Sequence, residues 1–128
     1  MWDTTEYDFS PYVNYVEMPK KEGGVAVEES PELRDRIFRR ELNRLEMSLK
    51  ALDPSASHRV VMTHFPPIGP RMEPSFASAL LEKYQVDLCV FGHLHSLKEG
   101  MLSFGTKNGV RYVLTSCDYL NFCPLKVL

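Results

Sequence analysis

The sequence has little of what would place it in several common classes of protein. Only three of its 128 residues are cysteines, and no two of them form a C-x-x-C pair. An odd number of cysteines without such spacing argues against a disulfide framework. Lysine and arginine total 15 against 17 aspartate and glutamate residues, so the formal net charge is −2. This balance gives no sign of a nucleic-acid partner or of an anionic membrane partner.

Long apolar runs are also missing. No stretch approaches the roughly 20 consecutive apolar residues that a bilayer-spanning helix needs. The N-terminus reads MWDTTEYD and is acidic, whereas a secretory signal begins with a basic segment followed by an apolar one. We therefore expect a cytoplasmic protein. The content of 44% hydrophobic and 25% charged residues is ordinary for one globular domain or for a piece of a larger one.

The chain begins with an irregular segment, residues 1–30. Prolines and a Gly23-Gly24 pair interrupt it, so we expect coil there with a short strand at 25–27. Ser30-Pro31-Glu32 then carries the signals of a helix start: an N-cap, a proline at the first helical position and an acid in the first turn. Apart from one adjacent pair, the apolar residues that follow recur every three or four positions and predict an amphipathic helix of about five turns. These residues are Leu33, Ile37, Phe38, Leu42, Leu45, Leu49 and Leu52.

Two short apolar runs follow the predicted helix. Residues 59–63 and 86–91 are typical of buried strands, and we expect Cys89, within the second run, to belong to the core. Between the runs lie a proline-rich loop over 65–75 and a helical pattern over 76–85. The order of strand, loop, helix and strand predicts a β-α-β unit with parallel strands.

A hairpin is predicted near the C-terminus. Asn108-Gly109 is a signal for a type I′ turn, and it lies between apolar stretches at 101–105 and 110–115. The fold class that these patterns indicate is α/β, with an antiparallel strand at the edge of the sheet.

Three of the four histidines come directly after the two predicted buried strands. His64 follows the first strand, and His93 and His95 follow the second. Because ligands of open α/β sheets bind beyond the carboxyl ends of the strands, we expect these imidazoles to lie close together. Residues two apart in an extended chain point to the same side, so His93 and His95 could reach one metal ion or two neighbouring ions. Spacing alone leaves open that they are ordinary hydrogen-bonded histidines.

For two further residues, Gly92 and His58, the sequence predicts simpler roles. Gly92, just before His93, would let the backbone turn sharply or approach a bound anion. His58, in the loop before the first strand, is expected at the surface.

Several other polar residues are weaker candidates for a site. Arg71, in the proline-rich loop, could bind a phosphate through its guanidinium fork, although a solvated loop arginine is the commoner case. Asp118 and Asn121 follow the last strand and could approach the site, but turn formation explains them better. No metal-binding spacing surrounds Cys117 and Cys123, so we interpret them as buried or incidental thiols.

Two segments of the sequence resemble a known family. Thr63-His64-Phe65-Pro66-Pro67 and Phe91-Gly92-His93-Leu94-His95 are similar to the last two sequence blocks of the calcineurin-like metallophosphoesterases, in the same order and spacing. The resemblance implies an α/β sandwich of two sheets with a two-metal site between them. It implies that His64 and His93 bind one divalent ion and His95 the other, the ions being manganese, iron or zinc. The implied activity is hydrolysis of a phosphoester substrate.

The sequence also departs from this family. The family's N-terminal blocks are an Asp-x-His pair, a Gly-Asp-x-x-Asp segment and a Gly-Asn-His-Asp/Glu segment, and none of them occurs here. The bridging carboxylate, the Asn ligand and the His usually assigned as general acid are therefore missing, and the catalytic residues are unknown. We expect residues 1–128 to be a single partial domain, the C-terminal half of the sandwich with the N-terminal half absent.

These departures lead to an expectation about partners and to two alternative functions. An uncovered inner sheet face predicts association with the missing N-terminal half or with a second copy, and we expect the chain alone to be inactive. The first alternative is a non-catalytic remnant or interaction domain. The second is a mononuclear structural zinc site formed by His93, His95 and either Cys117 or Cys123.

Overall fold

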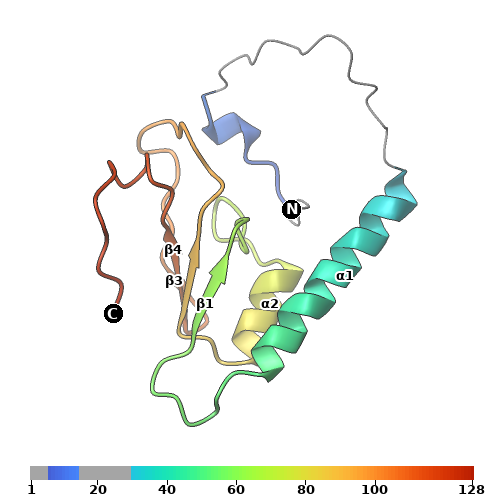
Figure 1. Cartoon of the computed structure of the whole chain (residues 1–128). Coiled ribbons are helices and arrows are strands. Elements are labelled where there is room, and N and C mark those ends of the chain that lie inside the picture. Colours follow the sequence, from blue (N-terminus) through green and yellow to red (C-terminus); the bar gives the residue numbers. More distant parts are fainter. Residues whose placement is uncertain (1–5, 15–29) are drawn as a thin grey trace.

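Figure 1 shows a computed structural model of the chain, which describes residues 6–14 and 30–128. The described part contains one four-stranded sheet, two α-helices and a short 3-10 helix at Ser10–Tyr12. The strand expected at 25–27 lies outside the described residues. The strands are β1 (Val60–Thr63), β2 (Leu88–Phe91), β3 (Thr106–Lys107) and β4 (Val110–Leu114).

The pairing of the strands confirms the predicted β-α-β unit. β1 lies parallel to β2, and α2 (Phe76–Lys83) connects them. β4 pairs in parallel with the other side of β2 and antiparallel with β3, which gives the order β1-β2-β4-β3. The predicted α/β class with an antiparallel edge is therefore correct. The described residues form one sheet, and β2 lies inside it with a parallel neighbour on each side.

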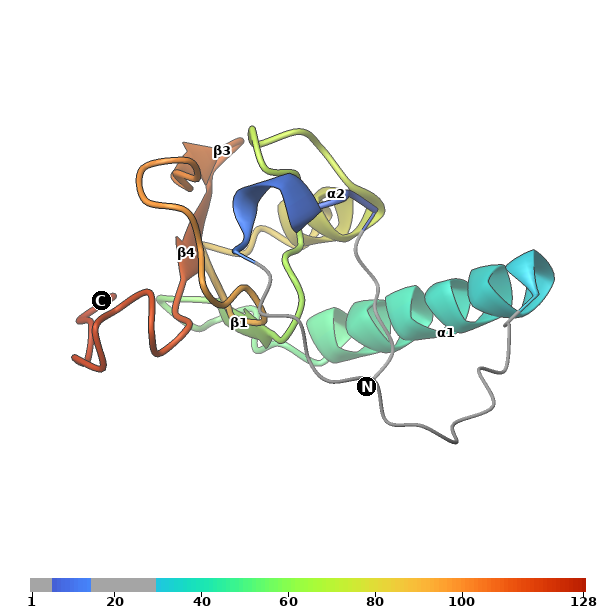
Figure 2. The ribbon, with the colours of Figure 1, turned by 90° about the horizontal axis from the view of Figure 1, so that it is seen from above.

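Both helices lie on the same side of the sheet (Figures 1 and 2). Helix α1 (Pro31–Lys50) begins where the sequence predicts, because the Ser30 hydroxyl accepts a hydrogen bond from the backbone N–H of Leu33 at 3.2 Å. Helix α2 begins with a capping box, in which Ser75 and Ser78 each bond the other's backbone N–H. In the part of the chain described, no helix is long and apolar enough to cross a membrane.

The apolar faces of the two helices are only partly buried. On α1, Leu49 is buried whereas Leu33, near the other end, is 41% exposed. The N-terminal turns of α1 extend away from the sheet (Figure 2). On α2, Leu81 is fully buried, but Phe76 is 63% exposed; its ring meets that of Phe38 with the centroids 6.1 Å apart. Burial therefore concentrates where the helices lie over the sheet.

The two strands that were expected to be buried differ in their exposure. β2 is buried, and Cys89 within it belongs to the core as predicted; burial raises the pKa of its thiol to about 12. β1 is not buried, since Met62 is 80% and Val60 37% exposed. The expectation for β1 is wrong because β1 is an edge strand, and no other described segment covers the face that carries these two side chains.

The predicted hairpin turn is present, but its first strand is shorter than expected. Asn108 and Gly109 have φ values of 47° and 84°, as a type I′ turn requires. β3 comprises only two residues, and 101–105 do not form a strand. Leu102 is buried in the core instead, which accounts for the apolar pattern of that stretch.

A carboxylate connects the two helices. Glu46 of α1 accepts hydrogen bonds from Lys83 Nζ and from the hydroxyl of Tyr84, both at 2.8 Å. These two donors, chiefly Lys83, lower the pKa of Glu46 below its ordinary value. The contact fixes the C-terminal end of α2 against the C-terminal turns of α1.

Replacing Glu46 with Gln should therefore destabilise the fold at neutral pH but not in acid. A carboxyl whose pKa is lowered by folding contributes stability above its ordinary pKa, about 4.3 for glutamate, and loses it as the pH falls through the lowered pKa. Urea unfolding should show the wild type more stable than E46Q near pH 7, and the difference should disappear as the pH falls through the lowered pKa of Glu46.

Glu99→Gln is the matched control, because Glu99 lies in an exposed turn. It should show no comparable gap at either pH. A gap of equal size in both variants would mean that general charge, and not the link between the helices, controls stability.

Candidate metal centre

Two of the predicted histidines meet at the carboxyl edge of the sheet. His64 follows β1 directly, and its carbonyl oxygen accepts a hydrogen bond from the N–H of Gly92, just after β2, at 3.1 Å. His64 Nε2 and His93 Nδ1 are hydrogen-bonded to each other at 3.2 Å. The rings lie edge-on with centroids 5.1 Å apart, and both residues are exposed. The expected meeting of these two imidazoles is confirmed.

The backbone around His93 differs from the expectation of an extended chain. His93 itself has a φ of 68°, and the N–H of Leu94 bonds the carbonyl of Gly92 at 2.8 Å. This i to i+2 hydrogen bond closes a γ-turn centred on His93, an uncommon conformation for a residue with a side chain. The sharp turn therefore falls on His93, not on Gly92. Because the segment is not extended, the argument that His93 and His95 point to the same side is wrong.

The third histidine has different partners. His95 Nδ1 lies 2.7 Å from Asp118 Oδ1, and the other oxygen of Asp118 accepts the backbone N–H of Ser96 at 2.7 Å. These hydrogen bonds, the backbone one first, lower the pKa of Asp118. The carboxylate therefore carries its negative charge beside His95 and links the loop after β2 to the segment after β4.

Sequence reasoning missed this role of Asp118. The backbone of Asp118 does form a turn, since its carbonyl accepts the N–H of Asn121 at 3.1 Å. Its carboxylate, however, reaches His95. The sequence predicts β4 only as the second strand of a hairpin. It does not indicate that β4 also pairs with β2. The parallel pairing of β4 with β2 brings the residues after both strands to one edge of the sheet.

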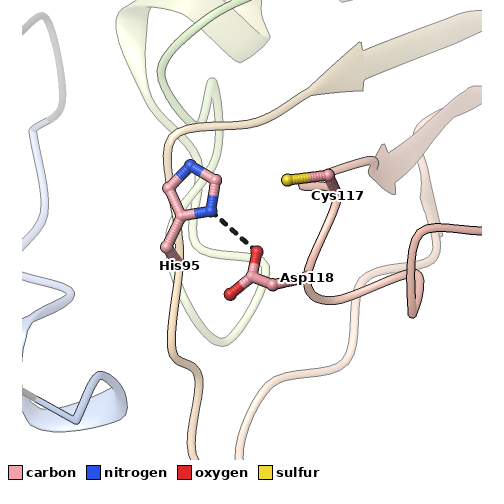
Figure 3. A group of neighbouring side chains, drawn as sticks. All are labelled: His95, Cys117 and Asp118. Atoms are coloured by element: carbon pink, nitrogen blue, oxygen red, sulfur yellow. Dashed lines mark hydrogen bonds and ion pairs between the residues drawn. The ribbon is translucent and has the colours of Figure 1, made fainter.

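A third side chain, Cys117, joins His95 and Asp118. The metal-ligating atoms of the three residues all lie within 4.8 Å of one another (Figure 3). No other such group of three occurs among residues 6–14 and 30–128. Both Cys117 and Cys123 are exposed rather than buried, and only Cys117 belongs to the group. The expected zinc site combined His93, His95 and a cysteine. In the structure Asp118 takes the place of His93 in that group.

The distance between His64 and His93 fits a shared metal ion. Imidazole nitrogens bind such ions at about 2.0–2.1 Å, so two nitrogens stand about 2.8–3.0 Å apart at octahedral angles and about 3.3–3.4 Å apart at tetrahedral angles. The observed separation of 3.2 Å lies between these two values. The two rings are accessible and already have the spacing that two ligands of one ion require.

A cavity of about 250 Å³ borders His64, between α1 and the proline-rich loop. The basic side chain that lines it is Arg44, which forms a 3.0 Å ion pair with Glu41. Arg71 is exposed and is not among the residues of this cavity, so its proposed contact with phosphate stays a prediction. His58 is exposed in the loop before β1, as expected.

Comparison with known proteins agrees with this geometry. The sequence model of the calcineurin-like phosphoesterase family matches residues 10–97, more than half of the chain. The chain therefore belongs to the calcineurin-like phosphoesterase family, whose members are generally enzymes with two metal ions. No curated protein matches the chain. The matched range includes β1, α2, β2 and all three candidate histidines.

The backbone of Gly92 leads to a prediction that separates it from Gly109. A Cβ on Gly92 would stand 3.9 Å from Ser116 Oγ and 4.0 Å from the His64 carbonyl oxygen, which are ordinary contacts, and Gly92 is not among the residues with positive φ. Gly92→Ala should change the free energy of unfolding by less than about 0.5 kcal/mol. Gly109→Ala, at a φ of 84°, should cost about 1 kcal/mol or more. Urea titration of both variants checks the difference, and a larger loss for Gly92→Ala would contradict it.

Proposed function

We propose that this chain supplies metal ligands for the hydrolysis of a phosphoester. The observation that carries the proposal is the 3.2 Å separation of His64 Nε2 and His93 Nδ1 at the carboxyl edge of parallel strands. That edge is where α/β sheets bind their ligands. Membership of the calcineurin-like phosphoesterase family supports the reaction class.

Each histidine has a distinct part in this proposal. His64 and His93 would hold one divalent ion, because their ring nitrogens are already spaced for it. His95 would hold the second ion. Two neighbouring divalent ions supply a Lewis acid for the phosphoryl oxygens and a hydroxide nucleophile at neutral pH. The residues leave manganese, iron and zinc open for the first ion, since imidazole binds all three.

The cavity beside His64 gives the substrate a place to extend. Its lining combines the apolar ring of Phe65 with the Glu41–Arg44 ion pair. A phosphoryl group held at His64 would therefore direct its leaving group toward a mixed polar and apolar surface. Arg71 is the weaker candidate for phosphate binding, because it lies outside this lining.

We further propose that residues 1–128 act as one partial domain that needs a partner. Two ions require more ligands than three imidazoles provide, and the family's carboxylate-bearing blocks do not occur in this sequence. The partner would be a polypeptide that carries those blocks, or a second copy of this chain. The exposed apolar side chains of β1, Val60 and Met62, support association on that face.

Manganese binding tests the ligand assignment. Removing a ligand from an ion that has few should weaken binding roughly tenfold or more. Calorimetric titration with Mn²⁺ should show this loss for His64→Ala and for His93→Ala. His58→Ala is the matched control, because His58 is an exposed histidine outside the site, and it should bind as the wild type does. Equal binding in all four proteins would refute the assignment.

Turnover of an aryl phosphodiester tests the need for a partner. The chain alone should hydrolyse bis(p-nitrophenyl) phosphate no faster than Mn²⁺ in buffer. Manganese-dependent turnover that His64→Ala abolishes would show that the chain builds a complete site by itself. Absence of both turnover and metal binding would favour the alternative of a non-catalytic interaction domain.

A further inference from the structure

The segment after β4 brings two potential metal ligands to His95. His95 lies in the loop after β2, whereas Cys117 and Asp118 follow β4, the parallel neighbour of β2. Figure 3 shows the Cys117 sulfur pointing toward the space between the His95 ring and the Asp118 carboxylate. All three ligand atoms lie within 4.8 Å of one another. This convergence comes from two loops more than 20 residues apart in the sequence.

The three side chains have the chemistry of a zinc site. Zinc is bound in proteins by cysteine thiolate, histidine nitrogen and carboxylate oxygen, and sites with three protein ligands keep a fourth position for water or substrate. Manganese and magnesium prefer oxygen ligands, so a thiolate selects against them. The group therefore differs in its metal preference from the two imidazoles of His64 and His93.

Charge also favours an ion at this group. A carboxylate and a thiolate together bring two negative charges, which offset the two positive charges of a divalent ion. The Asp118 carboxylate is held in position by the backbone N–H of Ser96 and by His95, each at 2.7 Å.

Binding requires a small movement and the relocation of two protons. Two ligands of a tetrahedral ion stand about 3.3 Å apart, so the His95–Asp118 contact of 2.7 Å would open by about 0.6 Å. Because ionised Asp118 can only accept a hydrogen bond, His95 Nδ1 carries the ring proton in the metal-free chain. That proton moves to Nε2 through solvent when Nδ1 binds the ion, and the thiol proton of Cys117 leaves to solvent.

We propose that His95, Cys117 and Asp118 bind one zinc ion. The proposal rests on the proposed function only in treating His95 as a metal ligand, and neither His64 nor His93 takes part in it. It assigns to the second ion a ligand set from this chain's own C-terminal segment, beyond residue 97 where the family match ends. The competing interpretation is that Asp118 only orients His95 and that Cys117 does not bind the metal ion.

Alkylation of the cysteines tests the proposal directly. Cys117 and Cys123 are both exposed, so both should react with iodoacetamide in the metal-free chain. Saturating Zn²⁺ should slow the reaction of Cys117 at least tenfold, because a metal-bound thiolate is a poor nucleophile, and should leave Cys123 unchanged. Mass spectrometry of the labelled peptides reports each cysteine separately. Cys89, buried with a raised thiol pKa, should stay unlabelled in every folded variant and so serves as the control for folding.

Cobalt substitution gives a second readout of the same ligand. Co²⁺ bound to a thiolate shows a ligand-to-metal charge-transfer band, which should be present in the wild type and in Cys123→Ser and absent in Cys117→Ser. His95→Ala and Asp118→Asn should weaken Zn²⁺ binding at least tenfold. Loss of affinity in Asp118→Asn, with an unprotected Cys117 and no thiolate band, would overturn the proposal and favour the orienting role.

The outcomes for the two metal proposals are distinguishable. Zinc protection of Cys117 that persists in His64→Ala and in His93→Ala supports the zinc site even if no manganese binds elsewhere. Manganese binding that depends on His64, without zinc protection of Cys117, supports the phosphoesterase proposal and overturns this one. Equal protection of Cys117 and Cys123 would indicate nonspecific binding to thiols and would also overturn it.

Discussion

The arrangement of the candidate site depends on the position of β2 within the sheet. Because β2 pairs in parallel with β1 on one side and with β4 on the other, three strands end at the same edge. Each strand end positions part of the candidate site. His64 follows β1, His93 and His95 follow β2, and Cys117 and Asp118 follow β4. Backbone hydrogen bonds hold the first two ends together, since Gly92 donates to the His64 carbonyl. An interruption of either pairing would separate groups that are far apart in the sequence.

The two groups at this edge differ in character although they share one loop. The ring nitrogens of His64 and His93 lie 3.2 Å apart, and His93 stands at the centre of the γ-turn. His95 lies two residues further on but contacts an ionised carboxylate. Buried Leu94 stands between them and anchors the turn. A single short loop thus directs one histidine toward His64 and the other toward an ionised carboxylate.

Much of the fold could be predicted from the sequence, because its signals are local. Ser30-Pro31 marks the start of α1, Asn108-Gly109 marks the type I′ turn, and the apolar run around Cys89 marks a central strand. The meeting of His64 with His93 followed from the β-α-β rule. The exposure of β1 and the contact of Asp118 with His95 could not be predicted, because both depend on which strand lies beside which. The left-handed backbone of His93 was missed as well, since glycine, the usual residue for such a turn, stands immediately before it.

The free edge of β1 has a consequence for how the molecule behaves in solution. In the described structure β1 pairs with β2 along one side only, so its other side presents unpaired backbone N–H and C=O groups next to the exposed thioether of Met62. Such an edge is a template for a further strand of any sequence. Addition of a strand there satisfies the backbone without any change at the histidines. Self-association by this route would therefore increase with protein concentration.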